Sequence, residues 1–182
     1  QENSDGNNPE NTSAWLWVAV TEMVAVYQVT LDRARRSAQA LLGENYGGLV
    51  ISDRYSAYNW LPVEHRQVCW AHLKRDFTRM AERSGVSKDI GQALLDQTRR
   101  LFRWWHRVRD GTLSRDLFQA LLARLRQRVH HLLSEAASFC DSRQDQTPLA
   151  KTARTCAQIL KLEPALWSFV EVEGVEPTNN TA

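Results

Sequence analysis

The sequence predicts an α/β protein in which a mixed β-sheet is combined with a large all-helical insertion. Two runs rich in aromatic and β-branched residues, over residues 14–20 and 24–31, are typical of strands. A short apolar run bounded by glycine, Leu49-Val50-Ile51, indicates a third strand that is buried on both faces. From about Ala71 onwards, apolar residues recur at helical spacing, which indicates a block of amphipathic helices.

Length and composition favour a globular protein and exclude several other classes. The 182 residues are enough for one domain with a core, and 43% hydrophobic with 24% charged residues is normal for such a domain. No apolar run approaches the roughly 18 residues of a membrane helix, and no signal-peptide pattern is present. Three widely spaced cysteines argue against a disulfide framework. We therefore expect a cytoplasmic protein without membrane contact.

The first part of the chain is expected to supply the sheet. Residues 1–13 are polar and form a loop or hairpin lead, and residues 14–20 and 24–31 pair as antiparallel strands. Asp32 is positioned to cap a helix over residues 33–42.

The buried strand at 49–51 ends at Ser52-Asp53-Arg54, and a short helix over 56–60 and a strand over 66–70 follow. Residues 14–72 therefore form an incomplete sheet-containing core.

The second part of the chain is expected to be helical over residues 73–170, either as an insertion into the α/β domain or as a separate helical subdomain. Residues 171–182 then return towards the core. Helices are expected from Ser87 to Asp110, from Ser114 towards Cys140, from Thr147 onwards and from Glu163 onwards.

The net charge of +2 conceals an uneven distribution of charge along the chain. Between Glu64 and His131, fifteen Lys and Arg residues face seven Asp and Glu residues, a balance of +8, whereas the rest of the chain has a balance of −6. A basic segment suits a phosphate backbone, although solvated helix faces give the same pattern. Arg103-Trp104 adds an indole that could stack on a base, while Trp105 fits the apolar stripe of a core. The candidate DNA-binding residues are Arg54, Lys74, Arg75, Arg103, Trp104 and Arg107.

Asp53 is the candidate catalytic residue. It follows a predicted buried strand, at the kind of sheet edge where ligands commonly bind in α/β proteins. Carboxylate oxygens suit Mg²⁺, and two-metal phosphoryl-transfer sites need several such groups. A turn aspartate that bonds to Tyr55 and Ser56 is the structural alternative.

Cys69 and His72 place a thiol and an imidazole three residues apart, which is half of a possible zinc site. A closed zinc site needs four ligands, and the sequence offers no partner pair at suitable spacing. We therefore do not expect zinc, and core packing of Cys69 is the simpler interpretation.

Taken in order, three segments resemble the insertion-sequence sixty-six family of bacterial transposases. They are the run from Asp53 to Tyr58, the run from Cys69 to Phe77, and the final residues from Pro177 to Ala182. The early strand Trp15–Val20 also matches, so the resemblance spans nearly the whole chain.

The resemblance implies a ribonuclease-H-like core with three catalytic acids in the order Asp, Asp, Glu, interrupted by a mostly helical insertion. Asp53 corresponds to the second acid, Cys69 and His72 to the Cys–x–x–His motif that follows it, and Asn179 and Asn180 to the entrance of the last catalytic helix. Two Mg²⁺ ions would activate water to cut a transposon end, and the freed 3′-hydroxyl would attack target DNA. DNA is the implied partner, with self-association in a transposition complex and a location at the bacterial nucleoid.

The sequence also departs from the family pattern. Asp5 lies in a polar loop and is not assigned as the first acid, and the third acid would follow Ala182. We therefore expect a central fragment that holds one of three acids and is inactive alone. A ribonuclease-H-like nuclease without strand transfer, a DNA-binding remnant of a decayed mobile element, and a structural helical protein remain alternatives.

Overall fold

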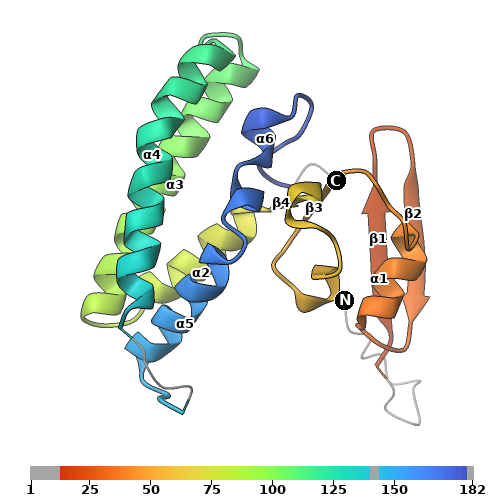
Figure 1. Cartoon of the computed structure of the whole chain (residues 1–182), viewed down its shortest axis with the longest axis horizontal. Coiled ribbons are helices and arrows are strands. Elements are labelled where there is room, and N and C mark those ends of the chain that lie inside the picture. The colour runs from red at the N-terminus through yellow and green to blue at the C-terminus, as the bar shows by residue number, and fades with distance from the viewer. Residues whose placement is uncertain (1–12, 140–143, 180–182) are drawn as a thin grey trace.

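The computed structural model describes residues 13–139 and 144–179, and its elements follow the predicted order from strands to helices (Figure 1). The strands are β1 (Trp15–Val20), β2 (Ala25–Thr30), β3 (Val50–Ser52) and β4 (Arg66–Val68). The α-helices are α1 (Arg35–Leu42), α2 (Trp70–Ala81), α3 (Val86–Arg109), α4 (Arg115–Ala137), α5 (Pro148–Leu160) and α6 (Ser168–Glu171). Single 3₁₀ turns are η1 (Ser56–Tyr58), η2 (Val63–His65) and η3 (Pro164–Leu166). The protein is thus of mixed α/β type, with far more helix than strand. Among the described residues, no helix has the length and apolar character needed to cross a membrane.

The prediction of one mixed sheet is wrong for the described residues, because the strands form two separate two-stranded sheets. The β1–β2 hairpin is antiparallel, as predicted, whereas β3 and β4 pair in parallel with Ser52 opposite Val68. The strand at β3 was also expected to be buried on both faces. Val50 and Ile51 are only half-buried, because within residues 13–139 and 144–179 β4 is the only strand paired with β3.

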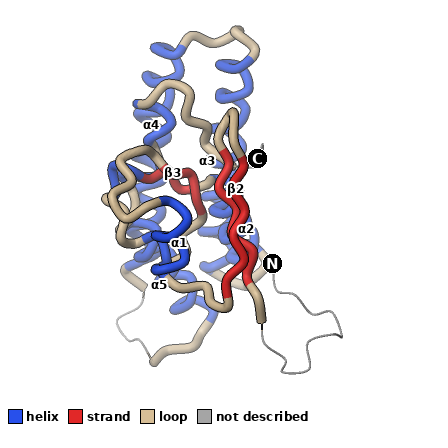
Figure 2. Tube along the Cα trace, turned by 90° about the vertical axis from the view of Figure 1, so that its right-hand side faces the viewer, coloured by secondary structure: helices blue, strands red, loops and turns tan. Residues whose placement is uncertain are grey.

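Two apolar cores hold these elements. The larger core fills the helical block and extends to Val68 and Trp70, at the junction of β4 and α2. The smaller core lies between the hairpin, α1 and η1, around Trp17, Ala38 and Ala57. Figure 1 shows the hairpin and α1 on one side of β3 and β4 with the helical block on the other, and Figure 2 turns the hairpin towards the viewer. The short parallel pair therefore connects two bodies with separate cores.

The helix starts follow the predicted capping residues in two cases of four. The side chain of Ser114 accepts a hydrogen bond from Leu117 N–H, and that of Thr147 accepts one from Ala150 N–H, as N-cap residues do. Ser87 was expected to cap α3 and does not.

The helix α3 begins at Val86, one residue before Ser87, and its N-cap is Gly85 at φ 59°. The buried Ser87 hydroxyl instead accepts a hydrogen bond from the Thr152 hydroxyl (3.1 Å). The sequence alone does not distinguish a serine that caps a helix from a serine that hydrogen-bonds to another helix, here α5.

Asp32 organises the start of α1 from outside the helix, which begins at Arg35 and not at residue 33 as expected. Its Oδ1 accepts hydrogen bonds from the Ser37 hydroxyl (2.7 Å) and from Ala34 N–H (2.9 Å). Bonds from Ser37, Arg36 and Ala34 lower the pKa of Asp32 to about 2.

Residues at the junction of β4 and α2 are joined to the segment from Leu166 to Pro177. Trp70 donates its backbone N–H to the Pro177 carbonyl (2.8 Å) and its indole N–H to the Leu166 carbonyl (2.8 Å). Gln67 donates to the same Leu166 carbonyl (3.2 Å) and accepts from Phe169 N–H (2.8 Å). Trp70 and Gln67 are fully buried, so these bonds are shielded from water. They hold the segment from Leu166 to Pro177 against the start of α2. We call this set of bonds the clasp.

Gly91 sets how closely α2 and α3 approach each other. A Cβ at this position would lie 2.3 Å from the backbone nitrogen of Ala81 and 2.8 Å from Met80 Cβ. We expect Gly91→Ala to lower the free energy of unfolding by about 1–3 kcal/mol, because the two helices must separate. Urea denaturation measures this. Gly47→Ala is the control, since nothing lies within 4 Å of its Cβ position; equal stability of both variants would contradict the close approach.

Candidate functional site

The parallel pairing of β3 with β4 places two predicted site residues at the same edge of the small sheet. Asp53 directly follows β3 and Cys69 directly follows β4. The strands are in register, and Cys69 N–H donates to the Ser52 carbonyl (2.8 Å). Edges formed by the carboxyl ends of strands are where ligands bind in open α/β sheets.

The two carboxylate oxygens of Asp53 have different partners: one accepts a hydrogen bond from the following turn, and the other lies near an arginine. Its Oδ1 accepts from Tyr55 N–H (2.9 Å), so the aspartate does organise a turn, as the structural alternative required. Its Oδ2 lies 3.7 Å from Arg33 Nη2, and its side chain is 30% exposed. The Arg33 guanidinium is held over the Tyr55 ring (4.0 Å) and the Trp15 ring (5.3 Å). Asp53 is therefore anchored but still accessible.

The sequence alone did not identify Arg33 as a neighbour of Asp53. Arg33 precedes α1 and Asp53 follows β3, and the packing of α1 against η1 brings these two segments together. No sequence signal indicated this pairing.

The described residues do not by themselves complete a metal site. Among residues 13–139 and 144–179, no group of three or more His, Cys, Asp or Glu side chains could hold a metal ion. Asp53 offers Oδ2 as a hard oxygen ligand, but Mg²⁺ sites of phosphoryl-transfer enzymes use more than one carboxylate. We therefore derive no reaction step through a metal from these residues.

Cys69 lies next to Asn179, although the two residues are 110 positions apart in the sequence. Cys69 is fully buried, and its thiol donates to Asn179 Oδ1 (3.1 Å) and lies 3.4 Å from Thr178 Oγ1. His72 is half-buried one turn into α2, and its buried Nδ1 has no hydrogen-bond partner in the described part of the chain. Asn180 lies outside the described residues. The structure thus brings Asp53, Cys69 and Asn179 to one sheet edge.

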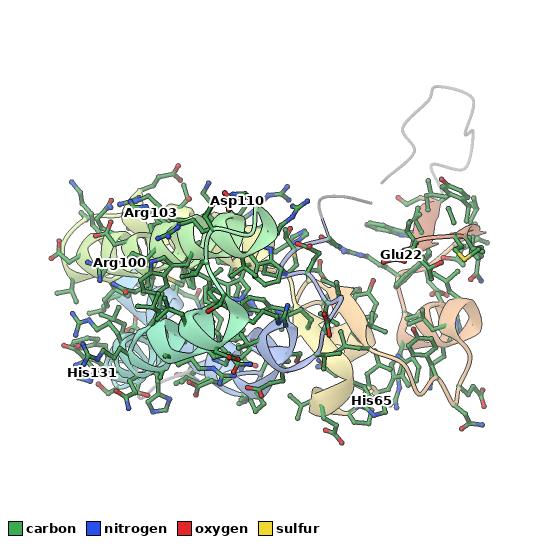
Figure 3. All side chains as sticks on the ribbon, turned by 90° about the horizontal axis from the view of Figure 1, so that it is seen from above. Glu22, His65, Arg100, Arg103, Asp110 and His131 are labelled. Carbon is green, nitrogen blue, oxygen red and sulfur yellow. The ribbon has the colours of Figure 1, made fainter. Side chains whose placement is uncertain are left out.

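A basic groove with a volume of about 960 Å³ lies between α2 and α3. Figure 3 labels Arg103, one of its residues, on α3. Cations line both sides, and Glu82 is the acidic residue of the lining. The lining residues are Ala71, Lys74, Arg75, Thr78, Arg79 and Glu82 on the α2 side, Thr98, Arg99, Phe102, Arg103 and His106 on α3, and Thr178. We call this feature the α2–α3 groove.

Three of the groove cations are available for a negatively charged partner. Arg79 lies 3.5 Å from Asp76, and Arg99 forms an ion pair with Asp96. In contrast, Lys74, Arg75 and Arg103 are exposed and form no ion pair with any described residue.

The other predicted DNA-binding residues lie outside the groove lining. Arg54 forms an ion pair with Asp76 and is largely buried. Trp104 is half-buried and packs against the larger core. Arg107 donates to the Thr112 carbonyl (3.0 Å) beyond the end of α3.

Sequence reasoning also missed Arg79 and Arg99, although each stands four residues from a predicted partner, Arg75 and Arg103. This i,i+4 spacing places both members of each pair on one helix face and could have identified them.

We expect that Cys69 acts as a hydrogen-bond donor and not as a metal ligand. A chelator should then leave the melting temperature unchanged, and Cys69→Ser should cost about 1 kcal/mol, because a hydroxyl can still donate to Asn179. Cys156→Ser is the control. Cys156 lies in the larger apolar core, and burial raises the pKa of its thiol to about 12. Because a hydroxyl is more polar than a thiol, Cys156→Ser should lower the free energy of unfolding by about 1–3 kcal/mol. Unfolding by the chelator would show that Cys69 holds a metal.

Comparison with known families identifies the family of the chain. The family model described as Transposase IS66 family matches residues 3–182, which is nearly the entire chain. No curated protein and no solved structure gives a significant match. The match confirms the resemblance carried by the segments around Asp53, Cys69 and Pro177. The chain belongs to the IS66 family of transposases.

Proposed function

We propose that this chain supplies one metal-binding carboxylate, Asp53, and a DNA-binding groove to a transposase that cuts and joins DNA. Family membership implies DNA as the partner and a divalent metal as the cofactor. The observation that carries the proposal is the position of Thr178. Thr178 lines the α2–α3 groove. Its Oγ1 lies 3.4 Å from Cys69 Sγ, at the edge of the β3–β4 sheet where Asp53 also lies.

The groove and the sheet edge are therefore neighbours. A phosphate backbone held by Lys74, Arg75 and Arg103 would run towards the edge where Asp53 lies. Basic side chains on two helix faces suit such a backbone, because each neutralised phosphate releases condensed counterions. A bound divalent metal would stabilise charge on the transferring phosphoryl group.

Arg33 is proposed to balance the charge of Asp53 when no metal is bound. Its Nη2 lies 3.7 Å from Asp53 Oδ2, which is too long for a close hydrogen bond, and its side chain is 43% exposed. A cation that is not closely hydrogen-bonded to Asp53 can move aside when a metal ion approaches. The aromatic rings of Tyr55 and Trp15 would retain it nearby.

The remaining metal ligands are proposed to come from residues that the structure does not describe. Asp53 alone cannot hold two metal ions, so the polypeptide is expected to be inactive alone. A ribonuclease-H-like core, action in the bacterial cytoplasm and self-association in a transposition complex are part of the same proposal.

The groove is tested by removing one cation from each of its walls. Arg75→Gln with Arg103→Gln should weaken binding to duplex DNA, and the slope of log affinity against log salt should fall by about 1 for each phosphate that is no longer neutralised. Fluorescence anisotropy over a series of salt concentrations measures both effects. Arg124→Gln with Arg128→Gln, two exposed arginines on α4, is the control with equal charge change. If both double variants lose affinity equally, the groove is not the DNA path.

Asp53 is tested in a longer chain that includes native flanking sequence. Asp53→Asn should reduce Mg²⁺-dependent cleavage of transposon-end DNA by at least roughly a hundredfold, because a metal ligand is lost while the side-chain size is kept. DNA binding should remain unchanged, and Asp116→Asn on α4 should retain full activity. Cleavage that survives Asp53→Asn would exclude a metal-binding role. Cut ends without joined product in the unmodified enzyme would indicate a nuclease.

A further inference from the structure

Arg66 is a buried cation whose hydrogen-bonding capacity is largely unused. It belongs to β4, is 2% exposed, and donates from Nη1 to Asn59 Oδ1 (3.2 Å). Its Nε and Nη2 are buried and have no hydrogen-bond partner in the part of the chain that the structure describes. Burial lowers the pKa of Arg66, which expresses the cost of keeping its charge away from water. Such a group needs an anionic partner.

The two unused nitrogens indicate the kind of partner. Nε–H and one Nη2–H point in the same direction along one edge of the planar guanidinium group. This fork matches two oxygens of a single carboxylate or phosphate. The charge of Asp53 acts on Arg66, but the two side chains form no ion pair, and Asp53 faces Arg33. The fork is therefore not matched by an acid among residues 13–139 and 144–179.

Arg66 lines a cavity of about 370 Å³ beneath the loop that follows Asp53. Arg54 and Lys161 also line it, and Ser56, Asn59 and Gln158 add hydroxyl and amide groups. None of its lining residues is acidic. The cavity shares no lining residue with the α2–α3 groove, so the two basic features are separate.

We propose that this cavity is an oxyanion site that takes a phosphate group, with the guanidinium group of Arg66 and the ammonium group of Lys161 as its cations. Arg54 is already paired with Asp76, so Arg66 and Lys161 supply the uncompensated charge. Two such charges match a phosphate dianion better than a singly charged carboxylate. The volume exceeds that of one phosphate group and admits the sugar of a nucleotide end as well. The site does not depend on metal binding at Asp53.

Thermal unfolding in inorganic phosphate, against sodium chloride of equal ionic strength, tests the site. At a phosphate concentration ten times its Kd, the melting temperature should rise by roughly 3–6 °C. Arg66→Gln should abolish this rise. It should still fold, because it removes a buried charge that has no ion-pair partner among the described residues. Lys161→Gln, at an exposed position, should weaken phosphate binding severalfold, and Arg100→Gln on α3 should retain the full rise.

Two results would overturn the proposal. One is the absence of any phosphate-dependent rise in the unmodified chain, as expected if water alone fills the cavity. The other is an equal rise in the Arg66→Gln and Lys161→Gln variants, which would indicate a general salt effect. Asp53→Asn should retain the rise, so failure of the metal proposal would leave this result unchanged. A dinucleotide with a 5′-phosphate, compared with its unphosphorylated form, distinguishes a nucleic-acid end from free phosphate as the source.

Discussion

The clasp is the interaction on which the rest of the arrangement depends. The indole bond from Trp70 to the Leu166 carbonyl joins residues 96 positions apart, and the Trp70 ring packs on Trp167 at 5.1 Å. Trp70 is the first residue of α2 and follows Cys69 directly. By fixing Trp70, the clasp fixes the sheet edge, the α2 wall of the groove and the segment that reaches Asn179 in one frame. Loss of these bonds would release the segment from Leu166 to Pro177, and with it Thr178 and Asn179, from the start of α2.

Local sequence patterns predicted most elements of the fold, while features that depend on distant partners escaped them. The hairpin, α4 and α5 follow from residue alternation, helical spacing and the caps Ser114 and Thr147, all of which act within a few residues. The single mixed sheet was wrong, because an apolar run such as the one at β3 does not reveal how many strands will pair with it. The prediction that Ser87 caps α3 was wrong for a similar reason, because its hydrogen bond with Thr152 joins two helices that are distant in the sequence.

In the candidate site, too, local sequence patterns were predictive and contacts between distant residues were not. The position of Asp53 at a strand end was anticipated, whereas the hydrogen bond between Cys69 and Asn179 was not, because only the fold brings these motifs together. Arg33 and Arg66 were not predicted, because distant neighbours bring the exposed Arg33 to Asp53 and bury Arg66. Charge alone suggests an exposed side chain, which is wrong for Arg66. The sequence therefore indicated the candidate acid Asp53 but not the cations around it.

A divalent metal at the edge formed by β3 and β4 is best tested by amide NMR spectra of a longer chain that includes native flanking sequence, recorded during titration with paramagnetic Mn²⁺. We expect the signals of Asp53, Arg54 and Cys69 to broaden first, because their amides adjoin the proposed ligand. Broadening centred elsewhere, for example at the His130–Glu163 pair, or no broadening near Asp53, would contradict it.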